Sequence, residues 1–231
     1  DRSEFFLDLM SHDINNMNHT GMGYLEIALY RLKGSISPED AALIEKAYDA
    51  LKSSSALIGN VRNIKEVQTE QHRLETFNLC QMLQELAKKY ARYHGRDINI
   101  SYKPPSGGCY IRAHRLFQEA LSNIIENAIK HSDPSRPLAI DMSLDRITER
   151  GTDFCRVIIE DNGPGIPGDV KESIFTRFKR GETRTGGRGL GLYIVKMLVD
   201  EFGGRVWVED RVPGDYRQGA RFVILMPAVE P

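Results

Sequence analysis

The chain has 231 residues, and its 31 Lys and Arg nearly balance its 32 Asp and Glu, so no strong field indicates a nucleic-acid partner. Its three cysteines lie far apart without metal-ligand spacing, which argues against a disulfide framework and is typical of a reducing cytoplasm. No stretch approaches the roughly 18 apolar residues of a membrane span and no signal peptide is present, so membrane attachment would need segments absent from this chain.

Two long amphipathic helices are predicted over residues 3–33 and 37–67. In the first, apolar residues recur at alternating steps of three and four: Leu7, Met10, Ile14, Met17, Gly21, Tyr24 and Ala28. Gly34 breaks the pattern, and Ser37 restarts it as an N-cap before a first-turn proline. Because a lone hairpin cannot bury both apolar stripes, we expect two copies to form a four-helix bundle, and hence a homodimer.

One histidine, His12, stands on the first helix but off this apolar stripe. The neighbouring Asp13 could accept a hydrogen bond from the Nδ1–H of the ring, which would leave Nε2 as a neutral nucleophile. Asn16 lies one turn further along the same face. A surface histidine beside an aspartate is usually plain solvated surface, and His19 shows how common surface histidines are. His12 therefore gains meaning only if the chain also binds a phosphoryl donor.

A domain boundary is predicted near residues 68–76, where the composition turns polar and the apolar period stops. Residues 1–71 would form one domain and residues 72–231 another. A short strand is predicted just before Asn78, which would cap an amphipathic helix. Further strands are predicted at 98–103, 110–111, 138–144, 154–159, 205–212 and 220–226. Together they would form a mixed sheet that helices cover on one face.

The helix predicted over residues 116–132 carries an unusual polar face. Asn123 and Asn127 are one turn apart, and Lys130 and His131 continue the same face. Amide oxygens suit Mg²⁺ bound together with a triphosphate, and Lys130 supplies a cation for phosphate. An exposed polar stripe without a ligand is the alternative interpretation.

A tight turn, Asp161-Asn162-Gly163-Pro164-Gly165, follows the apolar strand at 157–159. Gly163 and Gly165 allow positive φ and close backbone approach. Asp161, at the end of a buried strand, can accept a hydrogen bond from an amino group in a pocket. The Asp-x-Gly-x-Gly pattern also occurs in many ordinary turns, so by itself it is weak.

A second glycine-rich run, Gly186-Gly187-Arg188-Gly189-Leu190-Gly191-Leu192, precedes an apolar helix predicted to end near residue 202. Free N–H groups and the helix dipole favour phosphate there. The run lacks the Gly-x-x-x-x-Gly-Lys-Ser/Thr pattern of a P-loop, and it lacks the strand–glycine–helix succession of a dinucleotide fingerprint. Together, the two turns indicate a nucleotide site that offers a carboxylate to a base and amides to a polyphosphate.

In this order the motifs resemble those of sensor histidine kinases, within the wider family of gyrase, heat-shock-chaperone and mismatch-repair ATPases. Five segments carry the resemblance: the surroundings of His12 (phosphoacceptor box), 123–132 (N-box), 161–165 (first glycine box), 175–178 (F-box) and 187–192 (second glycine box). Asp13 stands where many members have Glu. The His-Asp-Ile-Asn-Asn form is similar to archaeal members.

The resemblance implies roles for individual residues. Asn127 would coordinate Mg²⁺ with Asn123 nearby, and Lys130 would contact the phosphates. Asp161, supported by Gly165, would recognise the adenine amino group. Residues 176–188 would form a mobile lid, whose candidate phosphate contacts are Lys179, Arg184, Arg188 and, as the strongest, Arg180. The other nucleotide-binding candidates are Gly163, Gly187, Gly189, Leu190, Gly191 and His131, which stands where an aromatic residue is common.

The implied fold is of the α+β class, a helical hairpin followed by an α/β sandwich, and the implied activity is that of an ATP- and Mg²⁺-dependent protein-histidine kinase. His12 would accept the phosphoryl group, Asp13 would orient the ring, and an Asp of a response-regulator receiver domain would receive the group. Asn16, four residues after His12, would serve a phosphatase activity. The chain would be the cytoplasmic portion of a membrane-bound sensor. Two alternatives stay open: an ATPase of the same superfamily that drives conformational change, and an inactive dimeric scaffold that binds a receiver domain.

Overall fold

The computed structural model describes residues 2–69, 74–91, 97–105, 107–176 and 191–231. Side chains are described from residue 12 onwards within these ranges, apart from 53, 56, 57 and 60–69. The chain divides into two compact units, residues 1–69 and 70–231.

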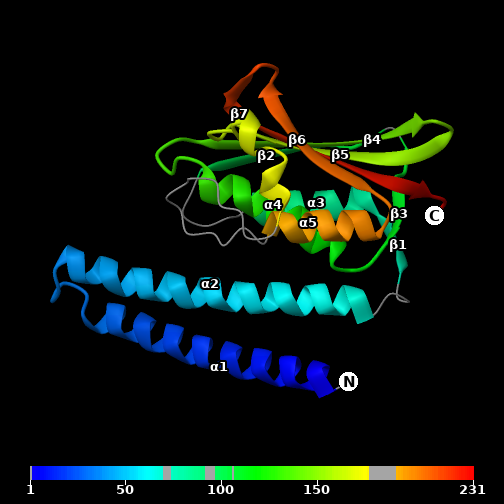
Figure 1. The fold of residues 1–231 in the computed structure, drawn as a ribbon. Coiled ribbons are helices and arrows are strands. Elements are labelled where there is room, and N and C mark those ends of the chain that lie inside the picture. Colours follow the sequence, from blue (N-terminus) through cyan, green and yellow to red (C-terminus); the bar gives the residue numbers. More distant parts are fainter. Residues whose placement is uncertain (1, 70–73, 92–96, 106, 177–190) are drawn as a thin grey trace. The chain divides into compact units, whose positions relative to one another are not determined.

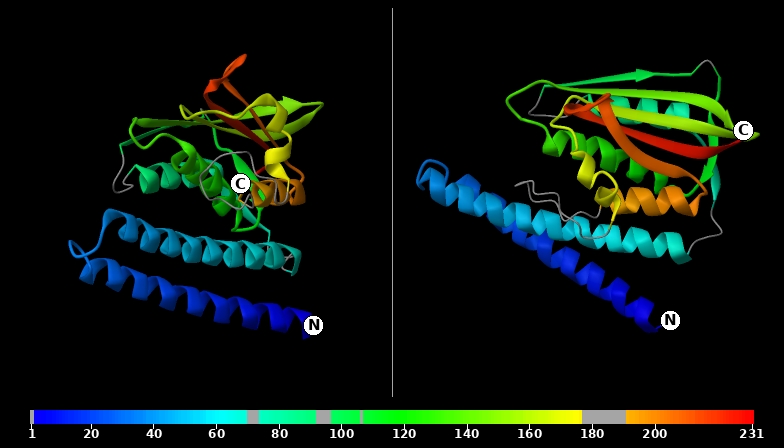
Figure 2. Two further views of the ribbon diagram at one scale, coloured as in Figure 1. Left: turned by 60° about the vertical axis from the view of Figure 1, so that its left-hand side comes forward. Right: turned by 45° about the horizontal axis from the view of Figure 1, so that its top comes forward.

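The first unit is an antiparallel helical hairpin, whose two helices lie side by side in every view (Figures 1 and 2). Helix α1 spans Arg2–Arg31 and helix α2 spans Pro38–Thr69. In the turn between them Gly34 takes a φ of +82°, a conformation that favours glycine. Ser37 Oγ accepts the N–H of Asp40 at 3.0 Å, so Ser37 caps α2 as predicted.

The two helices of the hairpin approach each other closely at Gly21. A β-carbon at Gly21 would lie 2.8 Å from Leu51 Cδ1. The Tyr48 hydroxyl donates to Glu26 across the hairpin at 2.8 Å. Large apolar side chains are nevertheless exposed on this unit: Ile14, Met17, Tyr24, Ile27, Tyr30, Leu32 and Leu43. No helix in the described part of the chain has the length and apolar character needed to cross a membrane.

The second unit is a mixed sheet with helices on one face, which Figures 1 and 2 both show. Its strands are β1 (Glu75–Asn78), β2 (Ile98–Lys103), β3 (Tyr110–Ala113), β4 (Leu138–Glu149), β5 (Thr152–Asp161), β6 (Arg205–Val212) and β7 (Asp215–Val229). The helices are α3 (Leu79–Tyr90), α4 (Phe117–His131) and α5 (Gly191–Glu201), with short 3₁₀ turns η1 (Gly168–Val170) and η2 (Ser173–Phe175). The sheet order is β1-β3-β7-β5-β4-β2, and β6 also pairs with β7. Among these pairs β2–β4 is parallel and the others are antiparallel.

The core lies between the sheet and the three helices. On β4, every second residue from Leu138 to Leu144 is buried, and Met142 and Leu144 pair with Ile159 and Val157 of β5 on the same face of the sheet. Helix α4 buries the opposite set, which includes Phe117, Leu121, Ile124, Ile125 and Ala128. The apolar face of the sheet packs on the apolar stripe of the helices, and this keeps the helices on one face. The predicted α+β fold is confirmed.

Four strands are longer than predicted: β3, β4, β5 and β7. β4 continues to Glu149 rather than ending near 144, because polar pairs rather than apolar alternation hold its outer end. There Asp153 accepts from Thr148 at 2.6 Å and from Arg146 Nη2 at 2.9 Å. A turn with positive φ at Arg150 and Gly151 joins β4 to β5.

Candidate functional site

Asp161 is the last residue of β5 and faces the helices, as do Val157 and Ile159 before it. It is 6% exposed. Its Oδ1 accepts the N–H of Gly163 at 2.8 Å and, at a longer 3.5 Å, the N–H of Ala220. Both contacts use the same oxygen, and the described residues give Oδ2 no hydrogen bond. A buried carboxylate thus keeps one oxygen for an N–H donor of a ligand.

Burial, above all, raises the pKa of the Asp161 carboxyl above its ordinary value. The backbone N–H groups of Gly163 and Ala220 and the charge of Arg211 oppose this shift. Ionisation of Asp161 therefore costs free energy in the folded protein, and a donor brought by a ligand would recover part of it.

At Gly165 and Gly219 a side chain has no room, because a neighbouring segment of backbone lies where the β-carbon would be. A β-carbon at Gly165 (φ +68°) would lie 1.5 Å from the Tyr216 carbonyl oxygen, and one at Gly219 (φ +118°) would lie 1.8 Å from the Asp161 carbonyl oxygen. The start of β7 is therefore part of the site. Sequence reasoning predicted Gly165 but missed Gly219 and Ala220, although a glycine just before an apolar strand is a known sign of close backbone approach.

Asn162 has a structural role between the two strands that flank it. Its Oδ1 accepts the N–H of Ala139 at 2.8 Å, and its Nδ2 donates to the Pro137 carbonyl oxygen at 3.3 Å. These bonds extend the β4–β5 pairing past its end. They hold the backbone on both sides of Asn162 in place, where the N–H of Gly163 donates to Asp161 Oδ1.

Helix α4, which carries the predicted asparagines, lies close to two of the other predicted segments. Asn123 and Asn127 are half-buried and Lys130 is exposed. At the end of α4, Ser132 Cβ would lie 3.6 Å from a β-carbon at Gly163. A β-carbon at Gly191, where α5 begins, would lie 3.4 Å from Asn123 Oδ1. The structure thus brings together three of the predicted segments, which lie far apart in the sequence.

His131, the last residue of α4, is half-buried. Burial and the charge of Lys130 lower the pKa of its imidazole below the ordinary value. The lowered pKa favours the neutral, flat form of the ring at physiological pH.

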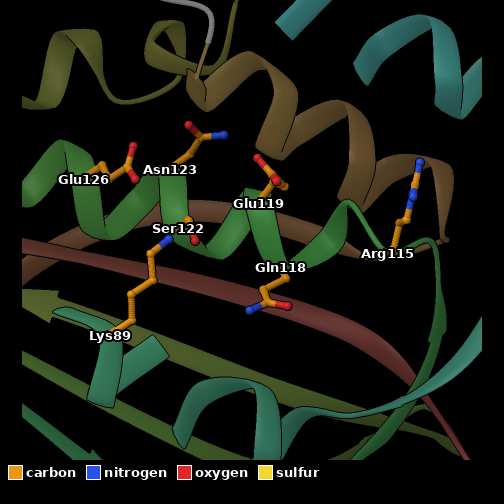
Figure 3. A pocket seen from close by; sticks show the side chains of 7 residues that line it. All are labelled: Lys89, Arg115, Gln118, Glu119, Ser122, Asn123 and Glu126. Carbon is orange, nitrogen blue, oxygen red and sulfur yellow. The ribbon is translucent and has the colours of Figure 1, made fainter. Parts of the chain in front are cut away.

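A polar pocket of ≈ 260 Å³ lies beside Asn123 (Figure 3). Lys89 comes from α3, and the other lining residues come from α4 and the turn before it: Arg115, Gln118, Glu119, Ser122, Asn123 and Glu126. The pocket overlaps the predicted site only at Asn123. Its lining is almost wholly polar, which does not suit the apolar faces of a base.

Several predicted residues fall within 177–190, outside the described residues: Lys179, Arg180, Arg184, Gly187, Arg188, Gly189 and Leu190. Of the predicted F-box, Phe175 is described. It is buried and meets Phe222 of β7 edge-on, with ring centroids 6.4 Å apart.

In the first unit, the side chains of Asp13 and Asn16 both lie close to the imidazole ring of His12. The side chains of His12 and Asp13 are 73% and 64% exposed. His12 Nδ1 lies 3.3 Å from Asp13 Oδ1 and 3.2 Å from Asn16 Nδ2. An exposed imidazole with its Nδ1 engaged can present Nε2 to an electrophile.

Residues 112–230 match the family model described as histidine kinase-, DNA gyrase B- and HSP90-like ATPase. The chain belongs to this family. The matched residues contain Asn123, Asn127, Asp161 and both glycine runs, as well as Gly219.

Two relatives are similar to the chain beyond the matched residues. The alginate biosynthesis sensor protein KinB of Pseudomonas aeruginosa is 28% identical over 98% of this chain and 37% of its own length. The signal transduction histidine-protein kinase/phosphatase MprB of Mycobacterium avium is 36% identical over 77% of this chain and 33% of its own. The chain therefore spans about a third of the length of these relatives.

A solved structure has the same fold over almost the whole chain. Full-length ShkA in complex with AMPPNP matches 97% of this chain and 46% of its own, with a TM-score of 0.70 and 23% identity. The match covers the helical hairpin as well as the sandwich, so both units of the fold occur together in that protein.

Proposed function

We propose that this chain is an ATP-dependent protein-histidine kinase, which phosphorylates its own His12 and passes the phosphoryl group to an Asp of a response-regulator receiver domain. The observation that carries the proposal is His12 itself, an exposed imidazole with an adjacent carboxylate, on a helical hairpin that precedes an ATPase-family domain. The hairpin with His12 supports a kinase over an ATPase that only changes conformation, because such an ATPase needs no phosphoryl acceptor.

In the second unit, Asp161 would accept the adenine amino group at Oδ2, while Gly163 and Ala220 hold Oδ1. Gly165 and Gly219 keep the surrounding backbone free of side chains. Lys130 would contact phosphate, and the start of α5 at Gly191 would offer N–H groups beside Asn123. The amide oxygen of Asn127 would hold Mg²⁺, which neutralises charge on the phosphates when bound.

The chemistry of the transfer follows from the His12 ring. The Nε2 lone pair attacks the γ-phosphorus of ATP in line, an N–P bond forms, and the bond to the bridging oxygen breaks to release ADP. Asp13 Oδ1, 3.3 Å from Nδ1, accepts the ring proton as positive charge develops. Arg180 and the other cations of the predicted lid are the proposed partners of the transferred phosphoryl oxygens.

The test is incubation of the chain with γ-labelled ATP, followed by acid treatment of the product. The parent and His19→Gln should carry acid-labile label, while His12→Gln should bind ATP and carry none. His19 is the matched control, because it is an exposed histidine on the same helix. Label that persists in His12→Gln would identify another acceptor. ATP hydrolysis without label in the parent would favour the alternative of a conformational ATPase.

Three further features belong to this proposal. The exposed apolar side chains of the hairpin support a homodimer, in which two hairpins form a four-helix bundle. Asn16, one turn from His12, supports a phosphatase activity towards the phosphorylated regulator, an activity that the name of MprB includes. The chain would act as the cytoplasmic portion of a longer, membrane-bound sensor, which agrees with the fraction of its relatives that it spans.

A further inference from the structure

Asp13 and Asn16 contact the same atom of His12, and they require opposite states of it. Asp13 Oδ1 lies 3.3 Å from Nδ1, and Asn16 Nδ2 lies 3.2 Å from that same nitrogen. A carboxylate accepts a hydrogen bond, so it needs a proton on Nδ1. An amide nitrogen donates one, so it needs a lone pair there.

A neutral imidazole carries one ring proton, so the two contacts cannot both be hydrogen bonds in one tautomer. With the proton on Nδ1, the ring donates to Asp13 and Nε2 keeps its lone pair. With the proton on Nε2, Nδ1 accepts from Asn16 and Nε2 has no lone pair to offer. The choice between the two partners is therefore a choice between a nucleophilic and a non-nucleophilic Nε2.

His19 provides a contrast on the same helix. Its Nδ1 lies 2.7 Å from the Asn15 carbonyl oxygen, which can only accept. His19 is thus held in the tautomer with the proton on Nδ1. The ring of His12 differs because a donor, Asn16, competes with the acceptor, Asp13.

We infer that Asn16 is a positioning residue that restrains phosphorylation of His12 by favouring the tautomer in which Nε2 is protonated, in competition with Asp13. The inference rests on the proposed kinase function for its consequence, but the tautomer itself is a property of α1. Asn16 then has an effect before any regulator is bound, in addition to its proposed phosphatase role.

The experiment is ¹⁵N NMR of the whole chain at a pH where the imidazoles are neutral, since the two ring nitrogens have different shifts in the two tautomers. The His12 signals are assigned by their loss in His12→Gln. Asn16→Ala should raise the ratio of Nδ1–H to Nε2–H tautomer about threefold or more, as expected for loss of one hydrogen bond. Asp13→Ala should lower that ratio.

Asn15→Ala is the matched control, because it makes the same change of residue type one position earlier and should leave the His12 ratio unchanged. The His19 signals should not move in Asn16→Ala or Asp13→Ala. An unchanged ratio in Asn16→Ala, or an equal change in Asn15→Ala, would overturn the inference.

The kinetic arm is the initial rate of His12 phosphorylation, which should rise in Asn16→Ala in proportion to the fraction of His12 rings in the Nδ1–H tautomer. If Asn16→Ala shifts the tautomer ratio of His12 but leaves the rate of its phosphorylation unchanged, Asn16 does not restrain phosphorylation. If neither the parent nor any variant takes up phosphate, the proposed kinase function fails, and the NMR ratio alone decides whether Asn16 selects the tautomer.

Discussion

The α-carbon of Gly219 lies so close to Asp161 that a β-carbon there would stand 1.8 Å from the Asp161 carbonyl oxygen. Gly219→Ala should therefore destabilise the second unit and weaken ATP binding together, because either β7 or the Asp161 turn must move. Gly214→Ala is the control, since Gly214 also has positive φ (+83°) but nothing within 4 Å of its β-carbon position. It should cost only about 1–2 kcal/mol. Urea unfolding checks both variants, and an equal loss in the two would contradict the close approach.

Asp161→Asn should raise the stability of the fold at neutral pH while it weakens the binding of ATP. Because burial raises the folded-state pKa of Asp161, folding is favoured while the carboxyl is protonated, and that advantage is lost as the pH rises through the folded pKa. The variant should therefore melt higher than the parent at neutral pH. The difference should vanish below the unfolded pKa of about 3.9.

The same substitution should weaken ATP binding by about 10–100-fold, as expected for loss of a hydrogen bond to a charged group. Calorimetric titration measures the affinity, and thermal scans at several pH values measure the stability. A variant that binds ATP like the parent would remove Asp161 from the proposed base contact.

The exposed apolar side chains of the hairpin predict how the chain associates. The parent should have twice the chain mass in light scattering, because Met17 and Tyr24, 72% and 70% exposed in the single chain, would be buried between copies. Met17→Glu combined with Tyr24→Glu should weaken the dimer by at least about tenfold. Val212→Glu, an exposed apolar site on the second unit, should leave it intact. A monomeric parent would contradict the four-helix bundle.

Asn16→Ala should lose the proposed phosphatase activity while it keeps transfer to the regulator. The Asn16 amide could hold a water in line with a phospho-Asp, and loss of such a positioned group typically costs about 100-fold or more. The measurement is the decay of purified phospho-regulator in the presence of ADP and each variant. Decay at the parent's rate would leave Asn16 without a role in dephosphorylation.

The fold could be predicted from sequence because local signals and hydrophobic period agree in most elements. Asn78 caps α3 with its side chain on the N–H groups of Cys80 and Gln81, as its position before an apolar helix indicates. Strand ends were less predictable. At the outer end of β4 no side chain is fully buried, so polar pairs such as Thr148 with Asp153, rather than apolar alternation, set the length of the strand.

The candidate site was predictable where a single segment carries the chemistry. Asp161, Gly165 and the asparagines of α4 each belong to such a segment. Gly219 and Ala220 do not, because their importance comes from β7 lying beside the Asp161 turn, and pairing of distant strands leaves no mark on local sequence. The competition of Asp13 and Asn16 for one nitrogen likewise depends on side-chain rotamers, which spacing on a helix does not determine.

The central place of β7 has a consequence for how the protein is made. Ala220, which completes the hydrogen bonds of Asp161, comes 59 residues after it in the chain. A ribosome that adds 5–20 residues per second needs roughly 3–12 s to supply those residues. Throughout that interval the nascent β5 strand exposes an unpaired edge next to Val157 and Ile159, so the newly made domain depends on shielding from other chains until its last strand arrives.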